Sequence, residues 1–431
     1  MTHKNMDFHV PVLTRVEGEG AMHVTVADGI VSDVRLEIYE PPRFFEALLV
    51  GRGHTEPPDI TARICGICPV AYQMSACHAI ERACGVTVSG QLRALRRLLY
   101  CGEWIESHVL HIGLLHAPDF LGYPSGIAIA ADHPDKVELV LQLKKTGNRL
   151  VEIVGGRSVH PVNVRLGGFH RLPSARDLRE LLPELEEARE RCIELVRWTA
   201  EFEVPEATVD VEFVSLRHPD EYPFNGGRVV SDRGLDIDVS EFEGHMVEVQ
   251  VPHSTALHGR RPNGDLYHVG PLARYANNFD VLPPAVQDLA NELGIGAVVR
   301  NPFRSIVVRG LEVLAAVEDA IRIITAYEPP ATPFVDVPAR AGEGWAATEA
   351  PRGLLYHRYR LDEDGSILAA TIIPPTSQNQ PSIEQDLRQF VGAHLHLPLD
   401  ELELRCEQSI RNYDPCISCA THFLQLTIES E

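Results

Sequence analysis

The sequence predicts an α+β fold that is predominantly helical, with a bundle of long helices at its core and β appendages at the N-terminus and in the C-terminal half. Two observations carry this prediction. Long segments in the first half repeat apolar residues at helical spacing. The N-terminal segment and the part after Pro205 instead contain short apolar runs bounded by turn residues, which is typical of strands.

The N-terminal part, about residues 1–60, is expected to be rich in β structure. Val10–Val26 and Ile30–Ile38 flank the tripeptide 27–29. Its Asp28 and Gly29 tolerate the positive φ angles that a tight hairpin turn requires. These two segments are therefore expected to pair.

Residues 61–204 are expected to form the helix bundle. Gln91–Leu115 repeats apolar residues at helical spacing, and so does Val137–Val154. Ala175–Phe202 follows, with Ser174 as a candidate N-cap. Each of these helices is long enough to join the core of a bundle.

Residues 205–422 are expected to mix short strands with helices. Helices are predicted at three places: Pro284–Leu293, Gly310–Tyr327 and Ile383–His394. Glu328–Gly344 is rich in Pro, Ala and Gly, so a surface loop is expected there. A hairpin of Leu354–Leu361 and Ile367–Ile373 should follow. Because no clean boundary is visible, we expect residues 1–422 to form one large domain.

Charge and hydropathy exclude several classes of protein. The 431 residues carry a formal net charge of −22, from 39 Lys and Arg against 61 Asp and Glu, which argues against a nucleic-acid surface. No apolar run reaches the roughly 18 residues that a membrane span needs. The N-terminus lacks the pattern of a secretory signal, so we expect a cytoplasmic protein.

The nine cysteines are the most informative residues. Without an export signal a disulfide framework is not expected. Five cysteines are scattered singly and are expected to pack as small apolar residues: Cys77, Cys84, Cys101, Cys192 and Cys406. The other four form two Cys-x-x-Cys pairs, Cys65 with Cys68 and Cys416 with Cys419.

The two pairs can share one metal only if the two ends of the fold meet, since 351 residues separate Cys65 from Cys416. Zinc is the commonest metal for paired Cys-x-x-Cys motifs. Soft thiolates also suit nickel and iron. Spacing alone leaves zinc, nickel and iron open, and it also allows that the two pairs do not share one site.

The contexts of both pairs resemble the two signature motifs of nickel–iron hydrogenase large subunits. The first reads Arg-x-Cys-Gly-x-Cys-Pro over Arg63–Pro69, and the second reads Asp-Pro-Cys-x-x-Cys-x-x-His over Asp414–His422. Tyr72 stands where many family members have His. The run Cys-Pro-Val-Ala-Tyr-Gln that contains it resembles the cytoplasmic NAD(P)-linked, sulfhydrogenase-like group of the family. Further blocks fit the family in order: Arg15–Gly18, Arg43–Glu46, Ala117–Asp119, Gly155–Arg157, His160–Pro161, Glu349–Gly353 and Pro375–Asn379.

The resemblance implies a nickel–iron centre that cleaves dihydrogen heterolytically and reversibly. Cys65 and Cys416 would bind nickel terminally, and Cys68 and Cys419 would bridge nickel to iron. The iron would carry carbon monoxide and cyanide ligands.

The same resemblance assigns residues around this centre. Glu17 would take a proton from a nickel thiolate, which we expect to be Cys416, and pass it outward. Arg352, beside Pro351, would lie over the open coordination position. It could act as a base or, as we favour, position charge together with Asp119 and Asp414. Two residues are assigned to the cofactor's surroundings: Pro351, and Thr376 as a hydrogen-bond donor to cyanide.

A second metal is also implied by the resemblance. Glu46, His422 and the backbone carbonyl of Ile372 would bind Mg²⁺, or Fe²⁺ because one ligand is an imidazole.

The partners follow from what the chain lacks. Gly294-Ile295-Gly296 does not complete a dinucleotide-binding fingerprint, and there are no further cysteine clusters. Electrons are therefore expected to leave through a partner subunit that carries iron–sulfur clusters. The resemblance implies that this partner is the hydrogenase small subunit, and that electrons pass to NAD(P)-reducing flavin and iron–sulfur subunits or, alternatively, to sulfur or a deazaflavin.

Maturation and rival functions complete the expectations. By resemblance, Phe423–Glu431 is a tail that a maturation protease removes after nickel-insertion factors have acted; an edge strand is the alternative. A non-catalytic zinc protein with four cysteine ligands is one rival function. A metal-free quinone-oxidoreductase subunit is the other, and retention of all four cysteines argues against it.

Overall fold

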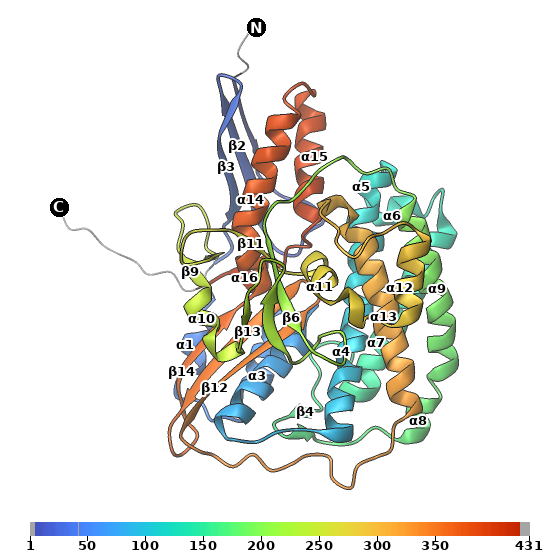
Figure 1. Cartoon of the computed structure of the whole chain (residues 1–431), viewed down its shortest axis with the longest axis vertical. Helices are drawn as coiled ribbons and strands as arrows, with labels where there is room; N and C mark the ends of the chain where they lie inside the picture. The colour runs from blue at the N-terminus through green and yellow to red at the C-terminus, as the bar shows by residue number, and fades with distance from the viewer. Residues whose placement is uncertain (1–4, 42, 423–431) are drawn as a thin grey trace, which may run out of the picture.

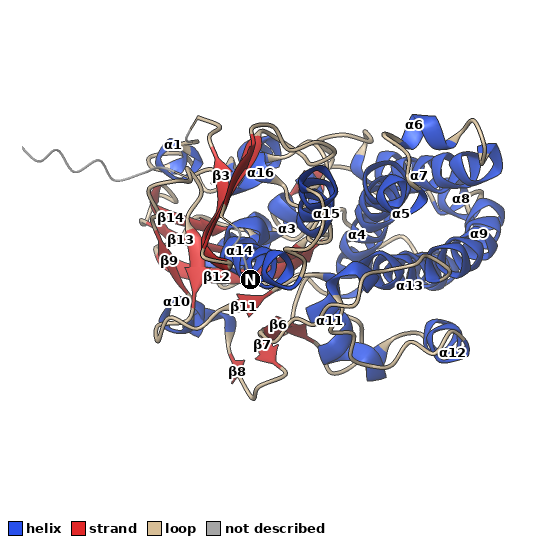
Figure 2. Ribbon diagram, turned by 90° about the horizontal axis from the view of Figure 1, so that it is seen from above, coloured by secondary structure: helices blue, strands red, loops and turns tan. Residues whose placement is uncertain are grey.

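A computed structural model describes residues 5–41 and 43–422. A bundle of long helices occupies one side of the molecule, and the strands lie on the other side together with further helices, as Figure 1 and Figure 2 show. The predominantly helical α+β fold predicted from the sequence is confirmed. No helix in the described part combines the length and apolar character needed to cross a membrane. The predicted tail, Phe423–Glu431, lies outside the described residues.

The bundle is built from long helices that pack pairwise. α4 packs against α7 and α13, and α9 packs against α13 and α7. Gly102 and Gly147 lie where α4 crosses α7, and a Cβ on Gly147 would come within 2.7 Å of a backbone nitrogen of α4. These glycines therefore permit the close approach of the two helices. The bundle helices are α4 (Gly90–Leu110), α7 (Pro134–Gly155), α9 (Leu182–Ala200) and α13 (Ser305–Thr325).

Two predicted helices are interrupted. The segment predicted as Gln91–Leu115 changes at its end into a π-helical turn, η2 (His111–His116), which precedes α5 (Ala117–Leu121). The segment predicted as Ala175–Phe202 divides into α8 (Ala175–Arg179) and α9. Pro183 restarts the helix because it suits a first turn and has no N–H to continue α8. Ser174 caps α8 as predicted, since its hydroxyl accepts the N–H of Asp177 at 3.0 Å.

The N-terminal sheet has the predicted hairpin but a shorter first strand. β1 (Met6–Val10), β2 (Gly20–Ala27) and β3 (Ile30–Ile38) pair antiparallel in that order. Asp28 and Gly29 have φ angles of 53° and 77°, as the turn requires. The continuous strand Val10–Val26 was a wrong expectation, because residues 11–19 form a loop that begins at a proline.

The sheet beneath the functional site is β12-β13-β14, all antiparallel. Its strands are β12 (Gly342–Ala350), β13 (Gly353–Leu361) and β14 (Ile367–Ile373), so the predicted hairpin gains a strand that takes the end of the predicted loop. Helix α3 (Pro69–Ala83), which periodicity did not reveal, lies across β12 and β13. A Cβ on Gly344 would lie 2.0 Å from the Ala79 carbonyl oxygen, so glycine is required for this contact.

Helices near the C-terminus connect the sheets. α14 (Pro375–Ala393) packs against β3 and β10 and begins earlier than the predicted Ile383. α15 (Leu399–Arg411) packs against α14 and was not predicted. Figure 1 shows both beside the N-terminal sheet.

Shorter elements complete the described chain. The helices are α1 (Phe45–Leu49), α2 (Pro57–Thr61), α6 (Gly126–Ile129), α10 (Phe242–His245), α11 (Pro271–Asn278), α12 (Pro284–Glu292) and α16 (Ile417–Ala420), with 3₁₀ turns η1 (Ala62–Ile64), η3 (Val239–Glu241), η4 (Phe279–Val281) and η5 (Pro302–Arg304). The strands are β4 (Val164–Arg165), β5 (Gly168–Phe169), β6 (Glu212–Arg217), β7 (Arg228–Ser231), β8 (Asp236–Ile237), β9 (Val247–Val249), β10 (His258–Arg260) and β11 (Tyr267–His268). They form sheets β4-β5, β10-β9 and β11-β6-β7-β8.

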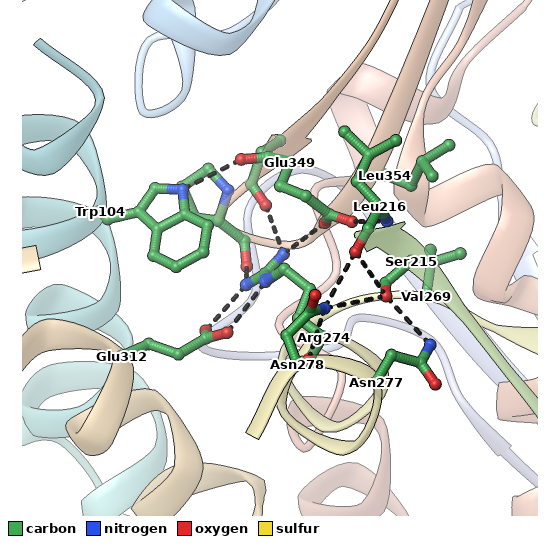
Figure 3. A network of polar contacts seen from close by, with 12 residues as sticks. Trp104, Ser215, Leu216, Val269, Arg274, Asn277, Asn278, Glu312, Glu349 and Leu354 are labelled. Carbon is green, nitrogen blue, oxygen red and sulfur yellow. Dashed lines mark hydrogen bonds and ion pairs between the residues drawn. The ribbon is translucent and has the colours of Figure 1, made fainter. Parts of the chain in front are cut away.

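A buried arginine joins the bundle to the central sheet. Figure 3 shows Arg274 of α11 between Glu312 of α13 and Glu349 of β12, all three fully buried. The guanidinium donates to both oxygens of Glu312, at 2.9 and 2.8 Å, and to Glu349 at 3.0 Å. Its centre also lies 4.3 Å from the ring of Trp104. Although burial opposes it, Arg274 holds the pKa of Glu312 at about 2.

The same guanidinium holds the backbone that follows β12. It donates to the carbonyl oxygens of Ala350 and Pro351, at 2.7 and 2.8 Å. Arg352 is the next residue, so the network fixes the segment from which that side chain extends.

Removing Arg274 should destabilise the protein strongly. Arg274→Ala leaves two buried carboxylates without their cation, and we expect the free energy of unfolding to fall by about 3–5 kcal/mol. The exposed pair of Arg197 with Glu292 is a matched control, for which Arg197→Ala should cost less than about 1 kcal/mol. Denaturant unfolding measures both, and equal losses would contradict the role of Arg274.

Candidate metal centre

The two Cys-x-x-Cys pairs meet in the interior. Cys65 Sγ lies 3.6 Å from Cys416 Sγ, and Cys68 Sγ lies 3.9 Å from Cys419 Sγ. All four sulfur atoms lie within 4.8 Å of one another, and all four residues are buried. The five single cysteines are buried too, which agrees with their predicted packing role.

A loop of the N-terminal part brings the two ends of the chain together. The backbone carbonyl of Glu17 accepts the N–H of Ile417 at 2.8 Å, so the loop pairs with the chain beside Cys416. A Cβ on Gly18, whose φ is 94°, would lie 2.7 Å from the Ile417 side chain. Glycine is therefore required at position 18 for this approach.

The Glu17 carboxylate faces the cluster. Its Oε2 accepts a hydrogen bond from the Cys416 thiol at 3.1 Å and another from the Ser418 N–H at 3.1 Å. Glu17 itself is only partly buried. It thus connects a buried thiol to the loop 11–19, part of which is exposed.

The environment favours a negative charge at Cys65 first. Its sulfur accepts the N–H groups of Ile67 and Cys68, both at 3.3 Å. Hydrogen bonds from the neighbouring thiols, that of Cys416 foremost, lower the pKa of Cys65. Burial raises the pKa of Cys416 and of Cys419. Four buried thiolates therefore need a bound cation to ionise together.

A buried carboxylate fixes the start of α3, next to Cys68. Glu103 accepts the N–H groups of Val70 and Ala71, at 2.6 and 3.1 Å, in place of an N-cap side chain. Burial raises the pKa of Glu103 well above its ordinary value. No sequence motif indicated this residue, because its partner is backbone that lies 33 residues away.

Arg352 is held beside the cysteines by Asp414. Its Nε donates to the Asp414 carbonyl at 2.7 Å, and its Nη2 donates to Asp414 Oδ1 at 3.1 Å. Burial alone would lower the pKa of Arg352, but the charges of Asp414 and the cysteines raise it. Arg352 Nη1 and Asp414 Oδ2 are buried and have no hydrogen-bond partner within residues 5–41 and 43–422. Asp414 adopts the left-handed region, with φ at 50°.

Asp119 lies in a different ion-pair network from the one expected. Its carboxylate pairs with Arg15 and with Arg411, the latter at 2.7 and 2.8 Å. Its hydrogen bonds and ion pairs in the described part of the chain do not include Arg352. The π-helical turn η2 precedes α5 and so sets where Asp119 points.

Thr376 contacts the backbone of the cluster, whereas Pro351 is held by Arg274. The Thr376 hydroxyl oxygen accepts the N–H of Cys416 at 3.0 Å. The Pro351 carbonyl accepts from Arg274, as described above. Tyr72, at the position where the sequence departs from the family pattern, is buried, and its hydroxyl has no hydrogen-bond partner in the part of the chain that the structure describes.

The residues expected at the second metal also meet. His422 Nε2 lies 3.1 Å from Glu46 Oε2, and Glu46 Oε1 accepts the N–H of Ile372 at 2.6 Å. These residues line a surface pocket that reaches Cys419. Glu248 of β9, which no motif indicated, has a solvent-inaccessible Oε1 without a partner. Burial raises the pKa of Glu248 to about 8.

These observations fit the metals that the sequence suggested. Four sulfur donors on one point suit a soft transition metal. The unpartnered Nη1 of Arg352 and Oδ2 of Asp414 leave hydrogen-bonding capacity for a bound group. At the second site, carboxylate oxygens suit magnesium.

Comparisons with known proteins point the same way. The sequence model described as nickel-dependent hydrogenase matches residues 43–138 and 260–422. The chain is 33% identical to sulfhydrogenase 1 subunit alpha of Pyrococcus furiosus over 419 residues, 96% of this chain and 97% of that protein. Sulfhydrogenase 2 subunit alpha of the same organism is 32% identical over 96% of this chain and 98% of its own length.

A solved structure gives the same result. The chain matches an NAD⁺-reducing [NiFe]-hydrogenase in the H₂-reduced state with a TM-score of 0.87 and 27% identity. The match covers 97% of this chain and 99% of the other.

Removing one of the four clustered thiols should abolish nickel binding. We expect Cys68→Ala to lose its nickel because the remaining three thiolates no longer enclose the ion. Cys77→Ala removes a buried thiol outside the cluster and should keep full nickel content. Elemental analysis of the purified proteins measures both, and full nickel in Cys68→Ala would refute the assignment.

Proposed function

The chain belongs to the nickel-dependent hydrogenase family, and we propose that its four clustered cysteines hold a nickel–iron centre whose iron carries carbon monoxide and cyanide. It is the catalytic large subunit of a hydrogenase, which cleaves dihydrogen reversibly into protons and electrons. The observation that supports the proposed site best is the convergence of four buried sulfurs, one of which, that of Cys416, is hydrogen-bonded to the Glu17 carboxylate.

The proposed ligand roles follow the pairing of the sulfurs. Cys65 and Cys416 would bind nickel terminally, and Cys68 and Cys419 would bridge nickel and iron. The hydrogen bond from Cys416 to Glu17 supports this division, since a terminal thiolate keeps lone pairs that can take a proton. When bound, the centre supplies the Lewis acidity and redox capacity that cleavage of dihydrogen needs.

Glu17 is proposed to move the proton. Its Oε2 lies within hydrogen-bond distance of the Cys416 sulfur, so a proton on that sulfur can pass to the carboxylate in one step. The carboxylate belongs to a partly exposed loop, which gives the proton a way toward solvent. Asp119 would serve this step as a positioning residue, because it pairs with Arg15, two residues before Glu17.

Arg352 is proposed to hold charge in place rather than to remove a proton. Two of its nitrogens are bound to Asp414, and a guanidinium stays protonated in proteins. The third, Nη1, is available to a group bound at the centre. Thr376 accepts the Cys416 N–H through its oxygen, so its hydroxyl hydrogen can be donated to cyanide beside Pro351.

The second metal is proposed to be Mg²⁺, or Fe²⁺, bound by Glu46, His422 and the carbonyl of Ile372. The contact between Glu46 and His422 supports this, and so does the unpartnered oxygen of nearby Glu248. Its chemical role would be to join the C-terminal segment of residues 417–422 to α1 and β14.

Electrons are proposed to leave through an iron–sulfur small subunit. The relatives described above are alpha subunits, so the protein works as part of a larger assembly. NAD(P) is the acceptor we favour, because a similar solved structure is an NAD⁺-reducing enzyme. Flavin and iron–sulfur subunits would then complete the assembly in the cytoplasm, with sulfur or a deazaflavin as alternative acceptors. Nickel-insertion factors and a protease acting after His422 would mature the chain.

Glu17→Gln should block proton transfer while leaving the metals bound. An amide cannot accept the proton, so we expect the rate of exchange between D₂ and water protons to fall about 10²–10⁴-fold. The exposed Glu19 provides the control, and Glu19→Gln should exchange at the parent rate. Mass spectrometry measures the exchange, and elemental analysis measures nickel in the same samples. Unchanged exchange in Glu17→Gln would contradict proton transfer through Glu17.

Arg352→Lys should slow turnover with metal content retained. Lysine cannot make both contacts with Asp414 and also present Nη1, so we expect a loss of about 10²–10³-fold in hydrogen oxidation. Arg358→Lys on β13 changes an outer ion pair and should have little effect. Near-native turnover of Arg352→Lys would reject the proposed role of Arg352.

The nickel–iron centre itself can be tested in the parent enzyme by infrared spectroscopy. Bands of bound carbon monoxide and cyanide are expected, whereas zinc as the only metal in the protein would overturn the proposed centre.

A further inference from the structure

A second group of potential ligands lies away from the cysteines. His253, in the loop after β9, His258 at the start of β10 and Glu384 of α14 place their ligand atoms within 4.8 Å of one another. None of the three lines the pocket of Glu46 and His422. They come from separate elements that pack together, since α14 contacts both β10 and β3.

The Glu384 carboxylate is satisfied on one side only. Its Oε1 accepts the N–H of Leu36 at 2.9 Å and contacts His253 Nε2 at 2.8 Å. Its Oε2 lies 4.0 Å from His258 Nδ1, which is too far for a hydrogen bond. The second oxygen therefore faces an imidazole without bonding to it.

His258 carries the strongest indication of a missing ligand. It is 1% exposed, and among the described residues neither of its ring nitrogens has a partner that meets the geometry of a hydrogen bond, although the Gln380 side chain lies beside the ring. Leaving a buried polar group unsatisfied is unfavourable. The Nε2 of Gln380 is likewise buried without a well-formed hydrogen bond to any described residue, so the pair does not satisfy itself in good geometry. A cation between His258 and Glu384 would use the ring lone pair and the second carboxylate oxygen together.

The ligand atoms are also held in place by their surroundings. Ser254, next to His253, donates to Gln380 of α14 at 3.2 Å. Thr255 donates through its backbone to Ile38 of β3 at 2.8 Å. The rings of His253 and His258 lie 5.5 Å apart and nearly perpendicular, so both can face one point. Rigid ligands of this kind favour a bound metal ion.

We propose that His253, His258 and Glu384 form a binding site for a zinc-like divalent transition metal, separate from the nickel–iron centre. Two imidazoles and one carboxylate are the ligand set of zinc sites that keep a fourth position for water. The carboxylate and His253 are partly exposed, at 15% and 20%, so water can occupy that position. Ligand atoms around tetrahedral zinc lie about 3.3 Å apart, and small side-chain rotations reach this from the present spacing.

The site would join β10 to α14 and, through Leu36, to β3. Thr376, which holds the backbone of Cys416, lies on the same helix α14. The metal would therefore brace a helix that supports the cysteine cluster. The proposal does not depend on the nickel–iron assignment, because none of its ligands is shared with that site.

The test is zinc content of the complete enzyme, isolated with nickel and iron bound so that the cysteines are occupied. After dialysis against zinc and removal of loosely bound ions, the parent should retain one zinc per chain more than Glu384→Gln and His258→Leu. His268→Leu removes another buried histidine and should retain that zinc. Equal zinc in the parent and Glu384→Gln, or no zinc in the parent, would overturn the proposal.

Two further measurements keep the result specific. Glu46→Gln should keep the zinc. Loss of zinc from Glu46→Gln but not from Glu384→Gln would place the zinc at Glu46 and His422 and refute the proposal. If His258→Leu does not fold, Glu384→Gln decides, since its amide oxygen can still accept the Leu36 N–H. Co²⁺ loaded in place of zinc should give visible d–d absorption in the parent that is lost in Glu384→Gln; the same absorption in both would refute the proposal.

Discussion

The metal centre depends on backbone contacts between segments that lie far apart in the chain. The Glu17 carbonyl accepts the Ile417 N–H, which joins the loop 11–19 to the second Cys-x-x-Cys pair. The two sulfurs of that pair lie 3.6 and 3.9 Å from sulfurs of the first pair. Bringing four sulfurs into a dry interior is unfavourable unless positive charge accompanies them. Arg352, in the turn between β12 and β13, supplies part of that positive charge. A bound metal would supply the rest.

The sequence predicted the parts of this protein whose residues carry a local signal. The cysteine motifs indicated the four sulfurs that the structure brings together, and apolar periodicity located the bundle helices. Helix α3 was not predicted because almost all its side chains are buried, so it has no polar face that would reveal a helical period. Glu103 could not be predicted because the backbone that it binds lies 33 residues away in sequence, and Glu248 could not because the groups around it, Glu46 and His422, are distant in sequence. Asp119 was in a recognised block, but its pairing with Arg411 depends on tertiary placement.

Buried polar groups link stability to function in this fold. Arg274 satisfies carboxylates from the bundle and the sheet and also holds the carbonyls that precede Arg352. A hydrophobic core of equal volume could stabilise the fold as well. It could not fix the direction of the segment that carries Arg352. We infer that the buried ions are retained for the geometry that they impose, as hydrogen bonds to charged groups are directional.

The separation of the two cysteine pairs also determines when the centre can exist. Cys65 and Cys416 are 351 residues apart, so a ribosome must release nearly the whole chain before the second pair can reach the first. The bundle helices lie between the two pairs in sequence, so their residues are synthesised before Cys416 and Cys419. The cluster of four sulfurs can therefore be completed only after nearly all the residues up to Cys419 have been made.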